Sequence, residues 1–315
     1  MYRIGIDLGG TNIVAGVVNE QYQIVASDKC KTAMPRPAEA IVADMAKVAF
    51  GAVEKAGISM EDIEYIGVGS PGVCNRATGI VENSNNLQFD NLPLCDMLGK
   101  LTGRKIYIEN DANAAALGEV KAGAAKGANT CVCITLGTGI GGGVLIDGKI
   151  YSGFNFAGAE LGHTVIVADG EPCSCGRKGC WEAYASATAL IRQTKRAMEA
   201  HPESIMWSMT DIDNVSGRTA FDAMRKGDET AKAVVDQYIR YLSTGLINMI
   251  NIFQPEIMCI GGGICNEGET LLGPVKEQIK KEVYSVNSDK ETQICVAQLG
   301  NDAGVIGASA LGEIQ

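Results

Sequence analysis

Short apolar runs rich in β-branched residues alternate along this chain with longer segments in which apolar residues recur every three to four positions. Runs of the first kind predict strands, at 3–8, 13–18, 22–27, 65–69, 105–109, 131–136, 143–146, 149–152, 256–261 and 293–299. Segments of the second kind predict helices, at 38–56, 92–102, 112–126, 182–199, 229–252, 270–283 and 302–313. Regular alternation of strands with helices is typical of α/β folds.

The order of these elements repeats. Each half of the chain reads as three strands, a helix, a strand, a helix, a strand and a helix, and a shift of 128 residues places 7–11 opposite 135–139. At 315 residues the chain also exceeds the usual size of one domain. We therefore expect two α/β domains with a cleft between them, one formed by 1–112 with the C-terminal helix 302–315 and one by 113–301. The alternative is a single doubly wound sheet with a coincidental second hairpin.

Charge and composition exclude several classes of protein. The net charge of −10 argues against a nucleic-acid partner, because such proteins neutralise phosphates with clustered Lys and Arg. No apolar stretch approaches the roughly 20 residues that span a bilayer, and no signal peptide opens the chain. Of the 11 cysteines, eight are scattered singly, as expected of small buried apolar residues in a reducing compartment. We expect a cytoplasmic protein without membrane or nucleic-acid partners.

Glycine-rich turns raise the question of a bound nucleotide. Residues 67–72 and 137–142 match G-x-G-x-x-G, but neither leads into a helix as the dinucleotide fingerprint requires. The segment 143–149 approaches a P-loop, but Ile150 stands where a Ser or Thr must bind magnesium. What remains is a pair of hairpin turns, one in each half, able to point backbone N–H groups at phosphate oxygens. Hairpins use glycine in any case, so an ordinary turn is the alternative for each.

A polyphosphate held by such turns needs a metal ion and room for the nucleoside. Asp7 ends the first strand, where its carboxylate could hold magnesium through water. Glycines 261–263 separate a strand from a helix and could admit an adenine or ribose, or form only a tight turn. The candidate nucleotide-binding residues are Asp7, Gly9, Gly10, Thr11, Asn12, Gly137, Thr138, Gly139, Gly262 and Gly263.

The other three cysteines, Cys173, Cys175 and Cys180, lie within eight residues of one another. One of only two histidines, His163, precedes the first of them by ten positions. One imidazole and three thiolates suit a tetrahedral zinc ion with no open position, which is the pattern of a structural site. The alternative is three reduced cysteines in a loop. A bound zinc would rigidify the segment that contains it.

Four motifs stand out in their order and spacing: DLGGT at 7–11, LGTGIGGG at 136–143, AGAELGH at 157–163 and CSCGRKGCWE at 173–182. Together they resemble those of the ROK family of sugar kinases and sugar-responsive repressors. The first two are shared with the wider actin-like ATPase superfamily, whereas the last two are specific to ROK proteins. The resemblance implies two ribonuclease-H-like domains, with the last helix packed on the first domain, and matches the zinc motif of the family.

Asp111 follows the strand 105–109 and opens a helix, where an acidic side chain is often a cap. In ROK kinases the aspartate of this motif is the catalytic base, so the resemblance assigns that role to Asp111. The sugar-binding residues that the resemblance implies are Asn110, Asp111, Glu160, His163 and Glu182, with Asn86 as a weaker candidate. Two departures are Asn12, where many relatives have Lys, and Phe89, where Trp is frequent. The second bears on the identity of the sugar.

These residues predict ATP-dependent phosphorylation of a hexose at its 6-hydroxyl, with glucose as the first candidate, Mg²⁺ bound with ATP, and a structural zinc. The alternatives are a kinase for N-acetylmannosamine, N-acetylglucosamine, mannose, fructose or allose, and a non-catalytic ROK regulator. ROK regulators carry a DNA-binding helix-turn-helix ahead of the first motif, whereas Asp7 lies near the start of this chain. A non-enzymatic actin-like ATPase module is disfavoured by Asp111 together with Glu182. We expect the kinase to be a homo-oligomer, either a dimer or a tetramer.

Overall fold

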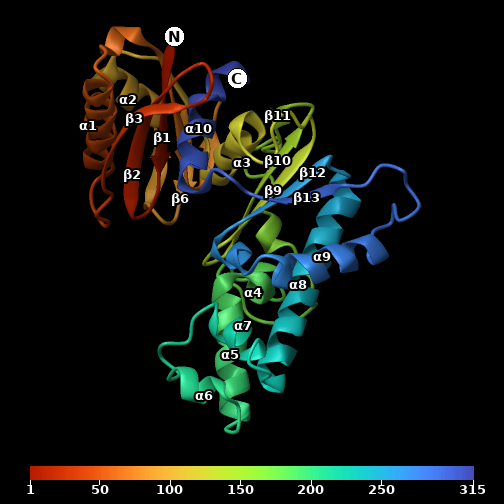
Figure 1. Cartoon of the computed structure of the whole chain (residues 1–315). Helices are drawn as coiled ribbons and strands as arrows, with labels where there is room; N and C mark the ends of the chain where they lie inside the picture. Colours follow the sequence, from red (N-terminus) through yellow and green to blue (C-terminus); the bar gives the residue numbers. More distant parts are fainter. The chain divides into compact units, whose positions relative to one another are not determined.

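The computed structural model describes residues 1–315, which form two compact units (Figure 1). Unit 1 comprises Met1–Cys133, Gly143–Ala159 and Ala297–Gln315, and unit 2 comprises Ile134–Gly142 and Glu160–Val296. The strands form two five-stranded sheets and one three-stranded sheet. None of the helices combines the length and the apolar character needed to cross a membrane.

The first sheet gathers the strands predicted in the N-terminal third of the chain. Its order is β3-β2-β1-β4-β8, with β1 at Tyr2–Leu8, β2 at Asn12–Val18, β3 at Ile24–Lys31, β4 at Ile63–Ser70 and β8 at Ile106–Asn110. The first three strands are antiparallel neighbours, whereas β4 and β8 run parallel to β1. The ends of the three parallel strands therefore lie along one edge of the sheet, where Asp7 pairs with Gly69 and Ser70 pairs with Asn110.

Helices cover both faces of this sheet. On one face α1 (Ala38–Ala56) packs Ile41 into the apolar cluster that contains Ile4 of β1. On the other face, a side chain on Gly5 would collide with the backbone of α10 (Ala303–Ser309). Successive residues of a strand face opposite sides of the sheet, so glycine at position 5 lets α10 approach the strand closely. The last α-helix of the chain thus packs against the first sheet within unit 1.

The second five-stranded sheet repeats the order of the first. It reads β11-β10-β9-β12-β13, with β9 at Cys131–Leu136, β10 at Ile140–Ile146, β11 at Lys149–Ile150, β12 at Ile257–Gly261 and β13 at Gln293–Val296. As in the first sheet, the hairpin strands β10 and β11 are antiparallel, and the last two strands are parallel. The predicted duplication is confirmed, and the alternative of a single doubly wound sheet is wrong.

Unit 2 contains most of the remaining helices: α4 (Glu182–Ala185), α5 (Ala187–Ala200), α6 (Met206–Met209), α7 (Thr219–Met224), α8 (Glu229–Phe253) and α9 (Glu269–Glu282). The apolar residues that recur at helical spacing along α8 are buried and form core. The single helix predicted at 182–199 is wrong, because the chain breaks at Ser186. The hydroxyl of Ser186 accepts a hydrogen bond from the backbone N–H of Ala189 at 3.1 Å and caps α5.

Some strands were not predicted from the sequence pattern, and the last helix was predicted too long. A three-stranded sheet formed by β5 (Val73–Asn75), β6 (Ile80–Ser84) and β7 (Phe89–Leu92) was not predicted, and it precedes α2 (Leu94–Thr102). Short 3₁₀ helices lie at Met60–Asp62, Leu161–His163, Gly263–Glu267, Gly300–Asp302 and Leu311–Glu313. The predicted helix 302–313 is thus divided between α10 and the last of these.

Helix α3 (Asp111–Ala122) ends four residues before its predicted end. The buried carboxylate of Glu119 accepts hydrogen bonds from the backbone N–H groups of Ala124 at 2.8 Å and Leu299 at 2.9 Å. Because Glu119 draws the chain after Gly123 out of helical geometry, the helix stops there. The same carboxylate fixes the segment that leads into α10.

Candidate active site

Two aspartates meet at the edge of the first sheet in unit 1. Asp7 lies near the end of β1, and Asp111 opens α3 directly after β8. Glycine at position 69, on the strand between them, leaves space there: a Cβ atom would lie 3.4 Å from the Cα atom of Asp111. The structure therefore brings together the residue predicted to bind magnesium and the residue predicted to be the base.

Burial raises the pKa of both carboxyl groups, and repulsion by Asp111 adds to the rise at Asp7. Burial, and then the negative charge of Asp111, raise the pKa of Asp7 from its ordinary value of 3.8 to about 6. Burial likewise raises the pKa of Asp111, although a hydrogen bond from the backbone N–H of Ala112 opposes this effect. Two acidic groups in such surroundings favour binding of a cation or a proton at neutral pH.

Asn110, and not Asp111, is the N-cap of α3. Its Oδ1 atom accepts hydrogen bonds from the backbone N–H groups of Ala112 at 2.9 Å and Asn113 at 3.2 Å. Its Nδ2 atom donates to the carbonyl oxygen of Gly72 at 3.2 Å. The carboxylate of Asp111 is thus not needed as the cap, although its Oδ1 atom accepts a hydrogen bond from the N–H group of Ala112 at 2.9 Å.

The glycine turn of unit 1 is a tight, exposed hairpin. The N–H group of Gly9 donates to the carbonyl oxygen of Asn12 at 2.9 Å, and Gly10, Thr11 and Asn12 are exposed. A Cβ atom on Gly10 would meet nothing within 4 Å, so the backbone of this turn is open to an approaching ligand. Asn86 is likewise exposed, in the turn between β6 and β7.

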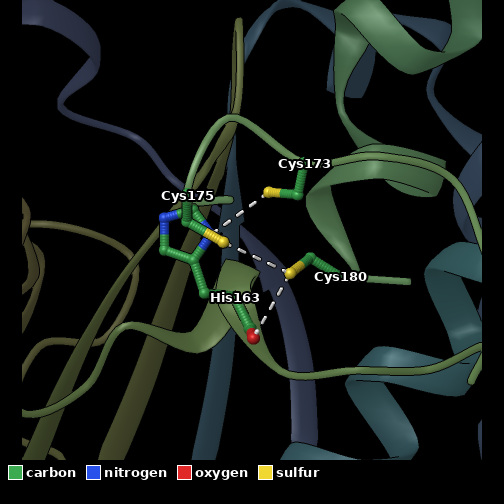
Figure 2. Close-up of side chains that lie close together, drawn as sticks. All are labelled: His163, Cys173, Cys175 and Cys180. Atoms are coloured by element: carbon green, nitrogen blue, oxygen red, sulfur yellow. Dashed lines mark hydrogen bonds between the residues drawn. The ribbon is translucent and has the colours of Figure 1, made fainter. Parts of the chain in front are cut away.

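The four predicted metal ligands converge in unit 2 (Figure 2). Their ligand atoms all lie within 4.8 Å of one another. The Sγ atom of Cys173 is 3.6 Å from Nδ1 of His163, and the Sγ atoms of Cys175 and Cys180 are also 3.6 Å apart. Ligands at about 2.0 to 2.3 Å from a tetrahedral zinc lie roughly 3.5 Å from one another, so the set fits this ion. Because Nδ1 faces the thiols, Nε2 is the ring nitrogen left for another partner.

The side chain of Glu182 connects the segment 160–182, the Cys/His loop, to the glycine turn of unit 2. Its Oε1 atom accepts hydrogen bonds from Cys173 Sγ and Ser174 Oγ, both at 3.1 Å. Its Oε2 atom accepts from the backbone N–H of Ile140 at 3.3 Å, and a side chain on Gly139 would collide with that oxygen. The position of the Glu182 carboxylate therefore depends on the segment 173–174 and on the turn before Ile140.

The remaining candidates of unit 2 lie on turns. Glu160 and Thr138 are exposed, and Glu160 accepts a hydrogen bond at its carbonyl oxygen from His163 N at 3.1 Å. The N–H group of Gly137 donates to the carbonyl of Gly139 at 3.0 Å. Gly262 has a φ of 106°, and a side chain there would collide with the carbonyl of Leu136. Gly263 starts a 3₁₀ helix and leaves open space for a Cβ atom.

Sequence reasoning missed one residue beside the aspartates. Glu109, the next to last residue of β8, is fully buried and accepts a hydrogen bond from the N–H group of Asn110 at 3.0 Å. A charged residue directly after the apolar run 106–108, within the predicted strand 105–109, was the available signal. Glu109 was passed over because the candidate motif began one residue later.

The repeated sheet order, with a glycine hairpin in each copy and acidic residues at the strand ends, defines a protein of the actin-like ATPase fold. Within that class, the chain belongs to the ROK family, whose model matches residues 3–314. A glucokinase from Thermotoga maritima is 38% identical over 311 residues, which cover 98% of this chain and 96% of that protein.

Two solved structures extend the comparison. A ROK family glucokinase from Streptomyces griseus, crystallised with glucose and AMPPNP, superimposes with a TM-score of 0.80 at 36% identity and covers 99% of both chains. A ROK hexokinase from Thermus thermophilus gives a TM-score of 0.82 at 33% identity, covering 98% of this chain and 97% of that one. The family match, over residues 3–314, spans every candidate residue described above.

Proposed function

We propose that this protein is a glucokinase, which transfers the γ-phosphoryl group of MgATP to the 6-hydroxyl of glucose. The observation that carries the proposal is the pairing of two partly buried carboxyl groups, Asp7 and Asp111, at the end of parallel strands. Similarity to glucokinases over 98% of the chain supports glucose as the sugar. The Streptomyces griseus relative, which holds glucose and the ATP analogue AMPPNP, supports ATP as the donor.

Asp111 acts as the general base. Its carboxylate accepts the proton of the 6-hydroxyl as O6 forms a bond to the γ-phosphorus and the bond to the leaving oxygen of ADP breaks. Burial raises the pKa of Asp111, which brings its basicity closer to what proton transfer at neutral pH requires. Phosphoryl transfer depends mainly on positioning and charge neutralisation, so one base and few other side chains suffice.

Asp7 holds the magnesium ion of MgATP, through water. Neutralising the carboxyl pair with a divalent cation removes the repulsion that raises the pKa of Asp7. The exposed turn with Gly10 and Thr11, and the turn that contains Thr138, present backbone N–H groups to the phosphates. Gly9, Asn12, Gly137 and Gly139 complete the two turns, and Gly262 and Gly263 line the nucleoside position.

The Cys/His loop holds a structural zinc ion through His163, Cys173, Cys175 and Cys180. Four protein ligands leave no open position, so the ion supplies rigidity and no chemistry. With zinc bound, the thiolate of Cys173 would have no proton to donate, so Glu182 Oε1 would keep the hydrogen bond from Ser174 and could accept another from a sugar hydroxyl. The sugar-binding set that we propose is Glu182, Nε2 of His163, Glu160, Asn110 and, with the weakest support, Asn86.

A panel of sugars tests the proposal. With ATP and magnesium, a coupled assay is expected to give the highest kcat/KM on glucose among glucose, mannose, N-acetylmannosamine, N-acetylglucosamine, fructose and allose. A preference for another sugar of the panel would correct the substrate, and no turnover on any would contradict the kinase. Light scattering after size-exclusion chromatography tests the predicted homo-oligomer.

A further inference from the structure

The fully buried carboxylate of Glu109 accepts hydrogen bonds from the first turn of α3, where Asp111 lies. The Oε1 atom of Glu109 accepts two hydrogen bonds, from the backbone N–H of Asn110 at 3.0 Å and from Nδ2 of Asn113 at 3.2 Å. These two partners lie on either side of Asp111 in the sequence. Glu109 therefore holds the first turn of the helix at the point where the proposed base emerges.

One cation balances this buried charge. Nη1 of Arg76, from the turn between β5 and β6, lies 3.5 Å from Oε2 of Glu109. The guanidinium also lies over the ring of Phe156, with 5.8 Å between its central carbon and the ring centroid. Burial raises the pKa of Glu109, whereas its hydrogen bonds and Arg76 act in the opposite direction. The three side chains come from three separate segments of unit 1.

The conformation of Phe156 shows that this contact is maintained against a local cost. Its φ of 61° lies in the left-handed region, which bulky side chains rarely adopt. Such a conformation persists only when surrounding contacts over-determine it. The contact with Arg76 is one of these, so Phe156 shields one side of the ion pair.

Stability alone does not explain a charged group at position 109. A buried ion pair contributes little to folding compared with apolar residues of the same volume, because both charges lose their hydration. A carboxylate with fixed acceptor positions does set the geometry of its partners. A displacement of the base by about 1 Å can cost 100-fold in rate.

We propose that Glu109 is a positioning residue for the catalytic Asn110–Asp111 segment, held in place by Arg76 under the ring of Phe156. The inference rests on the proposed glucokinase function, because it presumes that Asp111 is the base. It differs from that proposal in assigning part of the rate to a side chain that touches neither substrate.

The test compares Glu109→Gln with the wild type. Glutamine keeps the volume, but its amide presents one oxygen and one N–H₂ group, so it cannot accept from both the helix and Arg76. We expect kcat to fall by about 10- to 100-fold, while KM for glucose and for ATP changes by less than about threefold. Arg36→Met, which removes a comparable ion pair with Asp44 in the same unit, is the matched control and should leave kcat unchanged.

A second pair of variants keeps the test decisive if Glu109→Gln does not fold. Arg76 is partly exposed, so Arg76→Met is expected to fold and to lower kcat, and Arg76→Lys, which keeps the positive charge, is expected to restore most of it. A lower melting temperature with an unchanged kcat in both Glu109→Gln and Arg76→Met would overturn the positioning role. A wild type inactive on every sugar would instead contradict the glucokinase proposal, and the two failures are thereby distinguished.

Discussion

The indole of Trp181 occupies the space that a side chain at position 245 would fill. A Cβ atom built on Gly245 of α8 would overlap three atoms of the fully buried ring. Nε1 of Trp181 also donates to the carbonyl oxygen of Tyr241, one helical turn earlier, at 3.0 Å. Because Trp181 separates Cys180 from Glu182, α8 supports both a proposed zinc ligand and a proposed sugar ligand.

Gly245→Ala is expected to destabilise the protein by about 1 to 3 kcal/mol, because the ring must move out of a close-packed position. Thermal unfolding measures this effect, and KM for glucose should rise because Glu182 moves with Trp181. The matched control is Gly273→Ala in α9, where the nearest atom to the new methyl is Glu269 Oε2 at 3.5 Å. That change should stabilise the helix by about 0.5 to 1 kcal/mol. Equal melting temperatures for the two variants would contradict the packing argument.

Asp111→Asn is expected to lower kcat by about 100- to 10,000-fold, because asparagine cannot accept the proton of the sugar hydroxyl. Glucose binding, measured by calorimetry, should change by less than about threefold, since the amide keeps the shape of the side chain. A variant with wild-type kcat would show that the base is another residue.

Asp7 gives the stability of the protein a pH dependence. Its pKa is raised from 3.8 to about 6, so its contribution to the free energy of unfolding is complete below pH 4 and is lost as the pH rises through 6. The full shift corresponds to about 3 kcal/mol, of which we expect about 1 to 2 kcal/mol after structural relaxation. In magnesium-free buffer, Asp7→Asn should therefore be more stable than the wild type at pH 8, with a smaller difference at pH 5.

Urea unfolding at the two pH values measures the Asp7 effect, and the activity of Asp7→Asn should be strongly reduced. Asp213→Asn, at an exposed position of unit 2, is the control and should show no pH-dependent gain. Equal stability of Asp7→Asn and the wild type at pH 8 would mean that neither burial nor the charge of Asp111 destabilises the ionised carboxylate of Asp7.

Two alanine substitutions in the turn of unit 2 separate sugar binding from nucleotide binding. A methyl group on Gly139 would collide with Glu182 Oε2, whereas a methyl group on Gly137 meets nothing within 4 Å. Gly139→Ala should raise KM for glucose by about tenfold, because one charged hydrogen bond is worth about 1.5 to 3 kcal/mol. Gly137→Ala should raise mainly KM for ATP, because its methyl group faces open space that the proposal gives to phosphate. The reverse pattern would exchange the two assignments.

Cys175→Ser is expected to lower the zinc content from about one ion per chain to nearly none, measured by plasma emission spectrometry. Loss of the cross-link across residues 163–180 should cost about 3 kcal/mol of stability, comparable with opening a loop of that length. KM for glucose should rise more than KM for ATP. Cys30→Ser, outside the cluster, should keep its zinc. A zinc-free wild type with full activity would contradict the structural metal.

The sequence was sufficient where the relevant contacts are local. The duplicated sheet could be predicted because each strand and helix carries its own periodicity, and α1 begins and ends at the predicted residues. The Cys/His cluster could be predicted because four ligands within one short loop have few other ways to meet. The choice between Asn110 and Asp111 as the cap could not, because both residue types cap helices equally well.

Contacts between distant residues were not predictable. Nothing near Glu109 in the sequence indicates that Arg76, 33 positions earlier, provides its counter-charge. The break at Ser186 shows the same limit, since the helical pattern continues through it while Ala187 N–H instead donates to the carbonyl of Gly137 at 2.9 Å. At Ser186 a long-range hydrogen bond prevailed over the local helical propensity, and at Glu109 the partner is distant in sequence.

Because α10 packs against Gly5 of β1, the first sheet cannot complete its packing until the C-terminal end of the chain has been synthesised. A ribosome adds about 5 to 20 residues per second, so roughly 15 to 60 s separate the appearance of the first strand from that of the helix that covers it. During that interval the part of the N-terminal sheet around Gly5 lacks the helix that covers it, whereas α3 can already pack beside Gly69 on the same face. The proposed base and magnesium ligand therefore acquire their final surroundings only when the last residues of unit 1 have left the ribosome.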